Sequence, residues 1–448
     1  MRNDRGTGTA VVIGAGMAGL GAARVLSERF GSVTVLDRDT LPDDNTPRRG
    51  VPQGSHGHIL LVSGLRELAT LFDGLEDELL AAGGTRFDPG LGLRVYQYGR
   101  RSPTAPTGLE MIAMSRPLLE AVIRNRVGKL AGVTIRDQVA VTGLAGDGGR
   151  VTGVVLDTGE TLTADLVVDC SGRGSRSDRW LGDLGLPAPE QVEVKAGVSY
   201  STRIYRRRPG DLPEGEAFIV LPTPPGQTRL ALVMPIEDDR WLIGLGGWHL
   251  DNPPTDRESF EAFVRALPDP AIAEVMDRAE ALTDPVIFRF PSSRRRLFER
   301  LKTHPAGYLA LGDAICSFNP IYGQGMTCAA REAVALGATL DQHREPTAEM
   351  AGDYYRATSK VIATPWQFAV GGDFVYPQTT GPRPRGIKLS NWYARQIGLA
   401  SQVAPDIGAT FQSVQQLITP PGVLFRPGMI VRVLRLARRR LSAEAPSR

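Results

Sequence analysis

Glycines and acidic residues recur in this sequence at positions where proteins bind phosphates and sugar hydroxyls. The first set is the Gly-x-Gly-x-x-Gly pattern of residues 14–19, and Asp37 follows 18 residues after its last glycine. Glycines at these spacings permit a tight turn, a close approach of a pyrophosphate to the backbone, and close packing of a helix on a strand. A carboxylate at Asp37 can accept hydrogen bonds from ribose hydroxyls. This combination predicts a dinucleotide-binding site.

A second motif combines an acid with glycines near residue 320. Gly312 and Asp313 end a short apolar run, and the sequence Pro-Ile-Tyr-Gly-Gln-Gly-Met at residues 320–326 enters a helical segment. Asp313 could bind ribityl hydroxyls, while a glycine-rich helix start could place N–H groups beside a flavin oxygen or a phosphate. The alternative is a structural turn with a helix-capping Asp.

A third motif, Asp-Cys-Ser-Gly-Arg-Gly-Ser-Arg, spans residues 169–176 directly after an apolar strand. Its glycines, Gly172 among them, allow a close backbone approach. Asp169 and Arg176 could either bind a ligand or clamp the loop. A plain strand-to-loop junction is the alternative.

Hydrophobic periodicity places these motifs between strands and helices. We expect short buried strands at residues 10–13, 33–36 and 308–311, and helices at residues 17–30, 59–80, 115–130 and 327–340. Three β-rich runs within residues 139–168 predict an antiparallel meander, and residues 192–250 are again strand-like. Beyond residue 346 the pattern is helical.

The predicted fold class is α/β, with a Rossmann-type dinucleotide-binding domain, an inserted β-sheet domain and a C-terminal helical region. The binding domain is expected from three separated stretches, residues 1–85, 113–185 and 300–345. The β-rich substrate domain is expected from residues 86–112 and 186–299, and the helical region from residues 346–448.

The composition excludes several classes of protein. The 448 residues are 42% hydrophobic and 23% charged, which argues against a disordered or collagen-like chain. A net charge of +3 is too small to indicate nucleic-acid binding. Cys170, Cys316 and Cys328 have no metal-type spacing and cannot all pair in one chain, which favours reduced thiols and a cytoplasmic location. No stretch reaches 18 apolar residues, so stable membrane insertion is not expected.

In this order, the glycine fingerprint, the Asp-x-x-Gly loop and Gly-Asp followed by Pro-x-x-Gly-x-Gly resemble the FAD-dependent monooxygenases of the para-hydroxybenzoate hydroxylase type. The resemblance covers about residues 9–340. The segments at residues 48–58 (Arg-Arg-Gly-Val-Pro-Gln-Gly-Ser-His-Gly-His), 169–175 and 319–326 are similar to the flavin epoxidases of polyether biosynthesis, such as those for lasalocid and monensin. One departure is Cys170, which stands where the common motif Asp-Gly-x-x-Ser has its Gly. This weakens transfer of that motif's NADPH-binding role.

The resemblance implies FAD as cofactor. It places Arg49, Gln53 and Arg116 against the FAD diphosphate or ring, and Val139 behind the adenine. His56 and His58 precede a helix, a position that favours cofactor contact or helix capping over metal binding, and no metal site is expected. The residues predicted to bind the cofactor are Gly14, Ala15, Gly16, Met17, Ala18, Gly19, Asp37, Arg38, Arg49, Gln53, His56, Arg116, Val139, Asp169, Gly172, Gly312, Asp313, Pro320, Gly323, Gly325 and Met326.

In such enzymes, reduced FAD reacts with O₂ to give a C4a-hydroperoxide, whose terminal oxygen passes to an alkene or an activated ring. The protein must bind FAD, exclude water and aim the substrate, so no catalytic side chain is predicted. We expect an alkene epoxidase that acts on an apolar, polyketide-type intermediate of natural-product or antibiotic biosynthesis. A second Gly-x-Gly-x-x-Gly is lacking in the sequence, so hydride is expected from transiently docked NAD(P)H or from a partner flavin reductase.

Other functions share these motifs. A decalin-forming cyclase that keeps FAD as a structural group would have the same cofactor segments. A flavin halogenase is disfavoured, because neither its Trp-x-Trp-x-Ile-Pro segment nor its lysine is evident. A prenyl-chain reductase would saturate double bonds without consuming oxygen, and a non-enzymatic binding module would not need three FAD-contacting segments.

Two further groups of residues carry weaker predictions. The basic, partly amphipathic run at residues 432–441 favours a helix packed on its own domain, with membrane-surface binding as the alternative. Substrate selection is expected in the β-rich insertion. About a third of its large aromatic and Met side chains should line an apolar cavity, and the rest should be core; they are Tyr200, Phe218, Met234, Trp241 and Trp248.

Overall fold

A parallel sheet forms the centre of the nucleotide-binding part of the molecule. The computed structural model describes residues 6–249 and 253–442, and the strand order of this five-stranded sheet is β19-β11-β1-β2-β7. Most of its Val, Ile and Leu side chains are buried, because both faces of a parallel sheet must be covered. The strands are β1 (Thr9–Ile13), β2 (Ser32–Leu36), β7 (Val133–Arg136), β11 (Leu166–Asp169) and β19 (Tyr308–Ala310).

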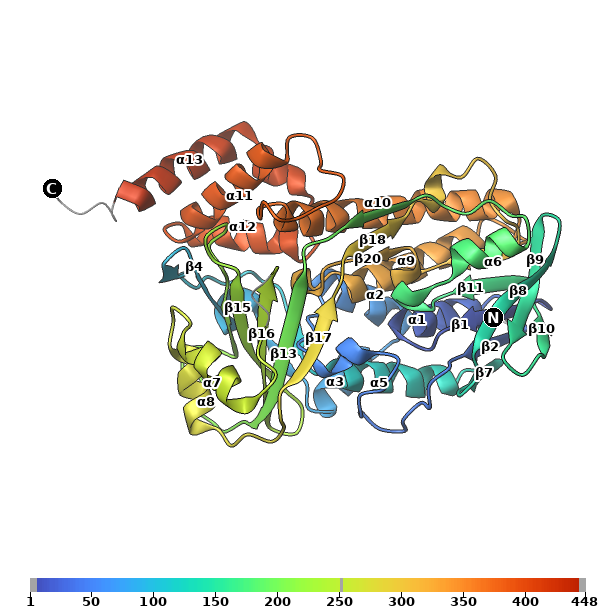
Figure 1. The fold of residues 1–448 in the computed structure, drawn as a ribbon, viewed down its shortest axis with the longest axis horizontal. Coiled ribbons are helices and arrows are strands. Elements are labelled where there is room, and N and C mark those ends of the chain that lie inside the picture. The colour runs from blue at the N-terminus through green and yellow to red at the C-terminus, as the bar shows by residue number, and fades with distance from the viewer. Residues whose placement is uncertain (1–5, 250–252, 443–448) are drawn as a thin grey trace.

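Helices from distant parts of the chain pack together beside this sheet (Figure 1). Helix α1 contacts α9 so closely that a Cβ on Gly21 would lie 3.2 Å from the Cβ of Ala333. The single helix predicted at residues 59–80 is wrong: the chain forms α2 and α3, because Gly74 has a φ of 68° that interrupts the helix. The helices are α1 (Met17–Leu26), α2 (Val62–Leu71), α3 (Leu75–Ala81), α5 (Arg116–Gly128), α6 (Ser177–Asp183) and α9 (Gly325–Leu340).

The predicted meander is present as a separate antiparallel sheet. It consists of β8 (Val141–Asp147), β9 (Arg150–Leu156) and β10 (Thr161–Thr163), in the order β10-β9-β8. The next strand, β11, leaves it and joins the parallel sheet beside β1. The chain thereby returns Asp169 to the edge at which β1 ends.

A seven-stranded sheet, called here the large sheet, stands beside the nucleotide-binding part (Figure 1). Its strand order is β17-β13-β16-β15-β14-β4-β5. Helices α7 (Arg257–Arg265) and α8 (Ala271–Arg278) cover one face with a buried apolar cluster. The strands are β4 (Leu93–Gln97), β5 (Arg100–Arg101), β13 (Val198–Arg206), β14 (Ala217–Val220), β15 (Arg229–Ile236), β16 (Arg240–Trp248) and β17 (Val286–Phe290).

Shorter elements join these parts. A three-stranded sheet has the order β12-β18-β20, and β3 pairs with β6. Their bounds are β3 (Thr85–Phe87), β6 (Met111–Ala113), β12 (Gln191–Val194), β18 (Ser293–Arg296) and β20 (Cys316–Ser317). The short helices are α4 (Pro89–Gly92), η1 (Pro52–Ser55), η2 (Gly172–Gly174), η3 (Phe298–Arg300), η4 (Gly312–Ala314), η5 (Pro320–Tyr322) and η6 (Pro421–Phe425).

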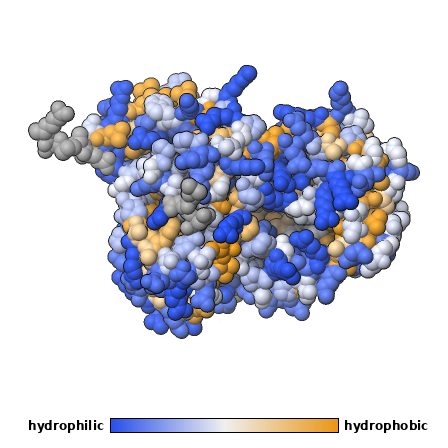
Figure 2. Space-filling model, viewed as in Figure 1, coloured by the Kyte–Doolittle hydropathy of each residue, from blue (hydrophilic) through white to orange (hydrophobic). Residues whose placement is uncertain are grey.

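The last part of the chain is helical, as predicted. Helix α10 (Ala348–Asp373) packs along α9, and α11 (Ile387–Ser401), α12 (Pro405–Gln415) and α13 (Pro427–Ser442) form a cluster with its own apolar core. The inner face of α13, with Val433 and Ala437, is buried in that cluster. Figure 2 shows hydrophobic and hydrophilic side chains interspersed over this region. The α/β fold class is confirmed.

Candidate functional site

The three predicted motifs meet at one edge of the parallel sheet. The carboxyl ends of β1, β11 and β19 lie side by side, with Ile13 opposite Asp169 and Asp169 opposite Ala310. Gly14 has a φ of +100°, and a Cβ there would lie 2.6 Å from the carbonyl oxygen of Cys170. A Cβ on Gly312 would lie 2.8 Å from that of Ala18. Segments far apart in sequence therefore enclose one site.

Within the first motif the glycines have distinct surroundings. A Cβ on Gly19 would lie 1.8 Å from the carbonyl oxygen of Gly14, so only a glycine fits at this position in the first turn of α1. A Cβ on Gly16 would meet only the Nη2 atom of Arg48, at 3.6 Å. Gly19 thus serves close packing, whereas Gly16 leaves room beside a guanidinium, as an approaching phosphate requires.

Asp37 is fixed beside the glycine turn by several donors. Its Oδ2 accepts hydrogen bonds from the backbone N–H of Ala15 at 2.7 Å and from Arg48 Nη1 at 2.9 Å. Val139, predicted to lie behind the adenine, donates its backbone N–H to the carbonyl oxygen of Asp37 at 2.8 Å. The predicted neighbours of the adenosine end are therefore together.

Arg48, which is not among the predicted cofactor residues, lies in this candidate site beside Asp37. Its side chain is 7% exposed and also donates to Asp39 at 3.1 Å and to Glu120 at 2.6 Å. The predicted Arg49 and Arg38 are exposed instead. The Arg-Arg pair was the available signal, but sequence alone could not tell which of two adjacent cations turns inward.

A second group of charges surrounds Asp313. Burial raises the pKa of this carboxyl, and the charges of Arg116 and Arg173 oppose that rise. Asp313 Oδ1 lies 3.6 Å from where a Cβ on Gly325 would stand. Ser115 caps α5 as predicted, by accepting the N–H of Leu118 at 3.2 Å. Arg116 thus begins α5 facing Asp313.

Several buried polar atoms around this edge lack a hydrogen-bond partner within the described residues. They are the Nε of Arg116, the Nε2 of His56 and the Oε1 of Gln324. Burial lowers the pKa of Arg116, and the charges of Glu120 and Asp313 oppose that lowering. A polar, anionic cofactor supplies the partners that such atoms need, so the residues present fit FAD.

Asp169 accepts hydrogen bonds from its own loop and from β19, which fits the clamping role considered for it. It is fully buried. Its Oδ1 accepts from the backbone N–H of Ser171 at 2.9 Å, and its Oδ2 accepts from the hydroxyls of Ser175 at 2.6 Å and Tyr308 at 3.0 Å. Arg176 is exposed. This motif shapes the backbone near Gly172, whose φ is 76°.

The segment with the two histidines links the nucleotide-binding part to the large sheet. His56 Nδ1 lies 2.8 Å from Thr202 Oγ1, and its ring centroid lies 5.9 Å from that of Phe288. Burial lowers the pKa of His56 to about 4 and that of His58 to about 3. Both imidazoles are therefore neutral at pH 7. Gln53, in η1 of the same segment, is partly buried.

The remaining predicted residues lie in or beside η5 and the start of α9. Pro320 begins η5, and Gly323 ends it with a φ of 65°. A Cβ on Gly323 would lie 3.4 Å from the Cβ of Ile59. Gly325 and Met326 are the first residues of α9, and Met326 is buried.

The large sheet has an apolar face toward this segment. Leu232, Met234 and Leu242 lie within 4 Å of where a Cβ on Gly57 would stand. Tyr200 contacts His56, with ring centroids 6.3 Å apart, from the same face. Of the five aromatic and Met residues singled out earlier, two pack instead against α7 and α8 on the opposite face, namely Phe218 and Trp241.

Glu332 is a second residue that the sequence prediction missed. It is buried on α9, and its Oε2 accepts the backbone N–H of Gly312 at 2.6 Å. Burial raises the pKa of Glu332 to about 8. Only its place on the buried side of a predicted helix could have revealed it.

This raised pKa predicts a pH-dependent stability. Between pH 4.5 and 8 the folded state keeps a proton that the unfolded chain has lost, so stability should fall as pH rises through this range, by several kcal/mol at about 1.4 kcal/mol per pKa unit. Glu332→Gln should remove most of this slope. Thermal unfolding of the apoprotein at pH 5, 6.5 and 8 measures it, with the exposed Glu349→Gln as control. Parallel curves for Glu332→Gln and wild type would contradict it.

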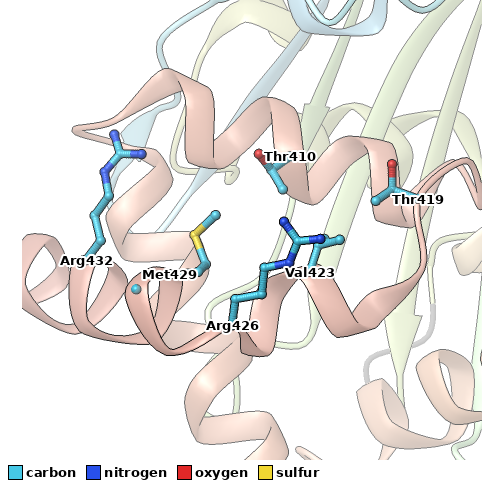
Figure 3. Close-up of a pocket in the computed structure, with 7 residues that line it drawn as sticks. Thr410, Thr419, Val423, Arg426, Met429 and Arg432 are labelled. Atoms are coloured by element: carbon cyan, nitrogen blue, oxygen red, sulfur yellow. The ribbon is translucent and has the colours of Figure 1, made fainter.

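A pocket of about 620 Å³ lies elsewhere, among the C-terminal helices (Figure 3). Its lining includes Thr410, Met429 and Arg432 but none of the predicted cofactor residues. In the described part of the chain, no group of three or more His, Cys, Asp or Glu could hold a metal ion. Over the same residues, no helix has the length and hydropathy needed to cross a membrane.

Comparison with known proteins places these motifs in context. Residues 7–364 match the family model described as FAD binding domain. The chain is 33% identical to Protein Rv3254 of Mycobacterium tuberculosis over 396 residues, covering 84% of this chain and 82% of that protein. It is 28% identical to kynurenine 3-monooxygenase of Myxococcus xanthus over 354 residues, covering 75% and 71% respectively. The structure of PqsL from Pseudomonas aeruginosa superposes with a TM-score of 0.61 at 18% identity, covering 83% of this chain and 99% of PqsL.

Proposed function

Because the chain belongs to the FAD-binding family that includes the flavin-dependent monooxygenases, we propose that this enzyme transfers one oxygen atom from O₂ to a carbon–carbon double bond. The proposed substrate is an apolar, polyketide-type intermediate of natural-product biosynthesis. The observation that carries the proposal is the convergence of the three motifs beside the apolar face of the large sheet.

The proposed FAD contacts follow from the charges at the sheet edge. Arg48 and Arg116 are buried cations suited to a diphosphate. Asp37 lies at the adenosine end and Asp313 at the ribityl end, where carboxylates can accept hydrogen bonds from hydroxyls. When bound and reduced, FAD would supply the activation of O₂.

The chain's own residues then have to orient the substrate and keep water out. The neutral His56 and the Leu and Met side chains of the large sheet that pack around Gly57 carry no charge. An apolar alkene loses little hydration free energy in such a setting, whereas a charged substrate would pay a large desolvation cost. This supports an apolar substrate over an ionic one.

The electron source is also part of the proposal. The residues of the single Gly-x-Gly-x-x-Gly are predicted to bind FAD. A separate nicotinamide-binding domain is therefore not expected. We propose that NAD(P)H docks transiently or that a partner flavin reductase delivers the electrons.

Isotope incorporation tests the proposed reaction. The protein would be incubated with FAD, NADPH, a flavin reductase and a panel of linear polyenes under ¹⁸O₂, and the products would be analysed by mass spectrometry. We expect one ¹⁸O atom per epoxide product and none without FAD. A product with the mass of its substrate would indicate a cyclase instead, and a gain of two hydrogens would indicate a reductase.

A further inference from the structure

A buried carboxylate, Asp373, lies where three parts of the molecule meet. It is the last residue of α10, is 0% exposed, and lies beyond residue 364, where the family match ends. Its Oδ1 accepts hydrogen bonds from Asn319 Nδ2 at 2.8 Å, Trp248 Nε1 at 3.3 Å and the Tyr322 hydroxyl at 3.4 Å. Trp248 belongs to the large sheet, whereas Asn319 and Tyr322 belong to the segment before α9.

Asn319 extends this contact into that segment. Its Oδ1 accepts from the Tyr200 hydroxyl at 2.9 Å and from the backbone N–H of Ile321 at 3.2 Å. Its own backbone N–H donates to Ser293 Oγ at 3.1 Å. Residues 319–322 are therefore held from the large sheet on one side and from α10 on the other.

The fit of α10 against this segment is also close. A Cβ on Gly372 would lie 2.0 Å from the Tyr322 hydroxyl oxygen and 2.6 Å from its Cζ. Any other residue at position 372 would displace Tyr322. Since α10 runs along α9 (Figure 1), the end of α10 fixes the start of α9 as well.

The chemistry of Asp373 favours a role beyond stability. Its Oδ2 is buried and lacks a hydrogen-bond partner among the described residues, and burial raises its pKa to about 6. Burying a polar group that is only partly satisfied costs free energy, and an apolar side chain of similar volume is often at least as stable. What the carboxylate provides is one acceptor shared by three donors, which fixes their relative positions.

We propose that Asp373 is a positioning residue, which through Asn319 and Tyr322 holds the predicted FAD-binding segment at Pro320–Tyr322 in register with the large sheet. The inference rests on the proposed function, because it takes this segment to lie against FAD. It makes the C-terminal helical region part of the site.

The variants Asp373→Ala and Asp373→Asn separate hydrogen bonding from charge. We expect Asp373→Ala to raise the dissociation constant of FAD at least tenfold and to shift the visible absorption spectrum of bound FAD. Asp373→Asn should bind FAD with the affinity of wild type, because its amide oxygen can accept from the same three donors. Fluorescence titration of the apoprotein with FAD measures both affinities. The control is Asp353→Asn on the same helix, which removes a carboxylate paired with Arg356 at the surface and should match wild type.

Further measurements decide the remaining outcomes. Asp373→Ala and Asn319→Ala should not be additive in FAD affinity, because both break the same contact. If Asp373→Ala fails to fold, Trp248→Phe and Tyr322→Phe should each weaken FAD binding by two- to threefold.

A lower apoprotein melting temperature with unchanged FAD affinity and spectrum would overturn the proposal, as would equal losses of FAD affinity in the Ala and Asn variants. A wild-type protein that binds no FAD would overturn the proposed function itself, and this inference with it.

Discussion

Asp313→Ala should weaken FAD binding about a hundredfold, an effect that corresponds to roughly 3 kcal/mol. Hydrogen bonds to a charged acceptor contribute about 1.5–3 kcal/mol each, and Asp313 is the carboxylate expected at the ribityl hydroxyls. Its replacement also removes one of the two carboxylates that interact with each of Arg116 and Arg173, leaving Glu120 beside the first and Glu193 beside the second. Fluorescence titration of the apoprotein with FAD measures the loss directly.

His249→Ala is the matched control for this prediction. Its ring lies against Tyr376, with centroids 5.7 Å apart, and its backbone N–H donates to the carbonyl oxygen of Gly197 at 2.7 Å. Neither of these neighbours is a predicted FAD-binding residue, so we expect the FAD affinity of this variant to equal that of wild type. Equal retention of FAD by both variants would refute the placement of the ribityl end at Asp313.

The parts of the fold that sequence predicted are those with local signals. Strand β1, the glycine turn and α1 lie within about 20 residues, and each glycine has a distinct steric reason. The Ser115 cap and the Asp313 turn are equally local. The alternation of strands and helices along the chain then predicts a parallel sheet.

The parts that sequence could not predict depend on distant contacts. Arg48 turns inward to Asp37 and Asp39 nearby in sequence and also to Glu120, 72 residues away. The clamp by Asp169 includes Tyr308, and the contact between Asp373 and Trp248 spans 125 residues. Partners so far apart in sequence come together only in the complete fold. They cannot be predicted from the residue types and spacing of a short segment.

Helix α1 ends at Leu26, whereas the apolar periodicity predicted a helix to residue 30. Phe30 is still buried against the core. The apolar periodicity therefore continues beyond the last residue of the helix. Periodicity reports which side chains face the core, and it defines helix ends less well.

Gly19→Ala and Gly16→Ala should separate folding from cofactor binding within one motif. A Cβ at position 19 would lie 1.8 Å from a backbone oxygen, which cannot move without displacing β1 or α1, so we expect a loss of about 3 kcal/mol or more. A Cβ at position 16 would meet only a side-chain nitrogen at 3.6 Å, an ordinary contact, so the Gly16→Ala apoprotein should melt near the wild-type temperature. FAD binding should nevertheless be largely lost in Gly16→Ala, because the added methyl group occupies the approach of the diphosphate. Thermal unfolding and FAD titration of both variants test this, and a Gly16→Ala protein with full FAD affinity would place the diphosphate elsewhere.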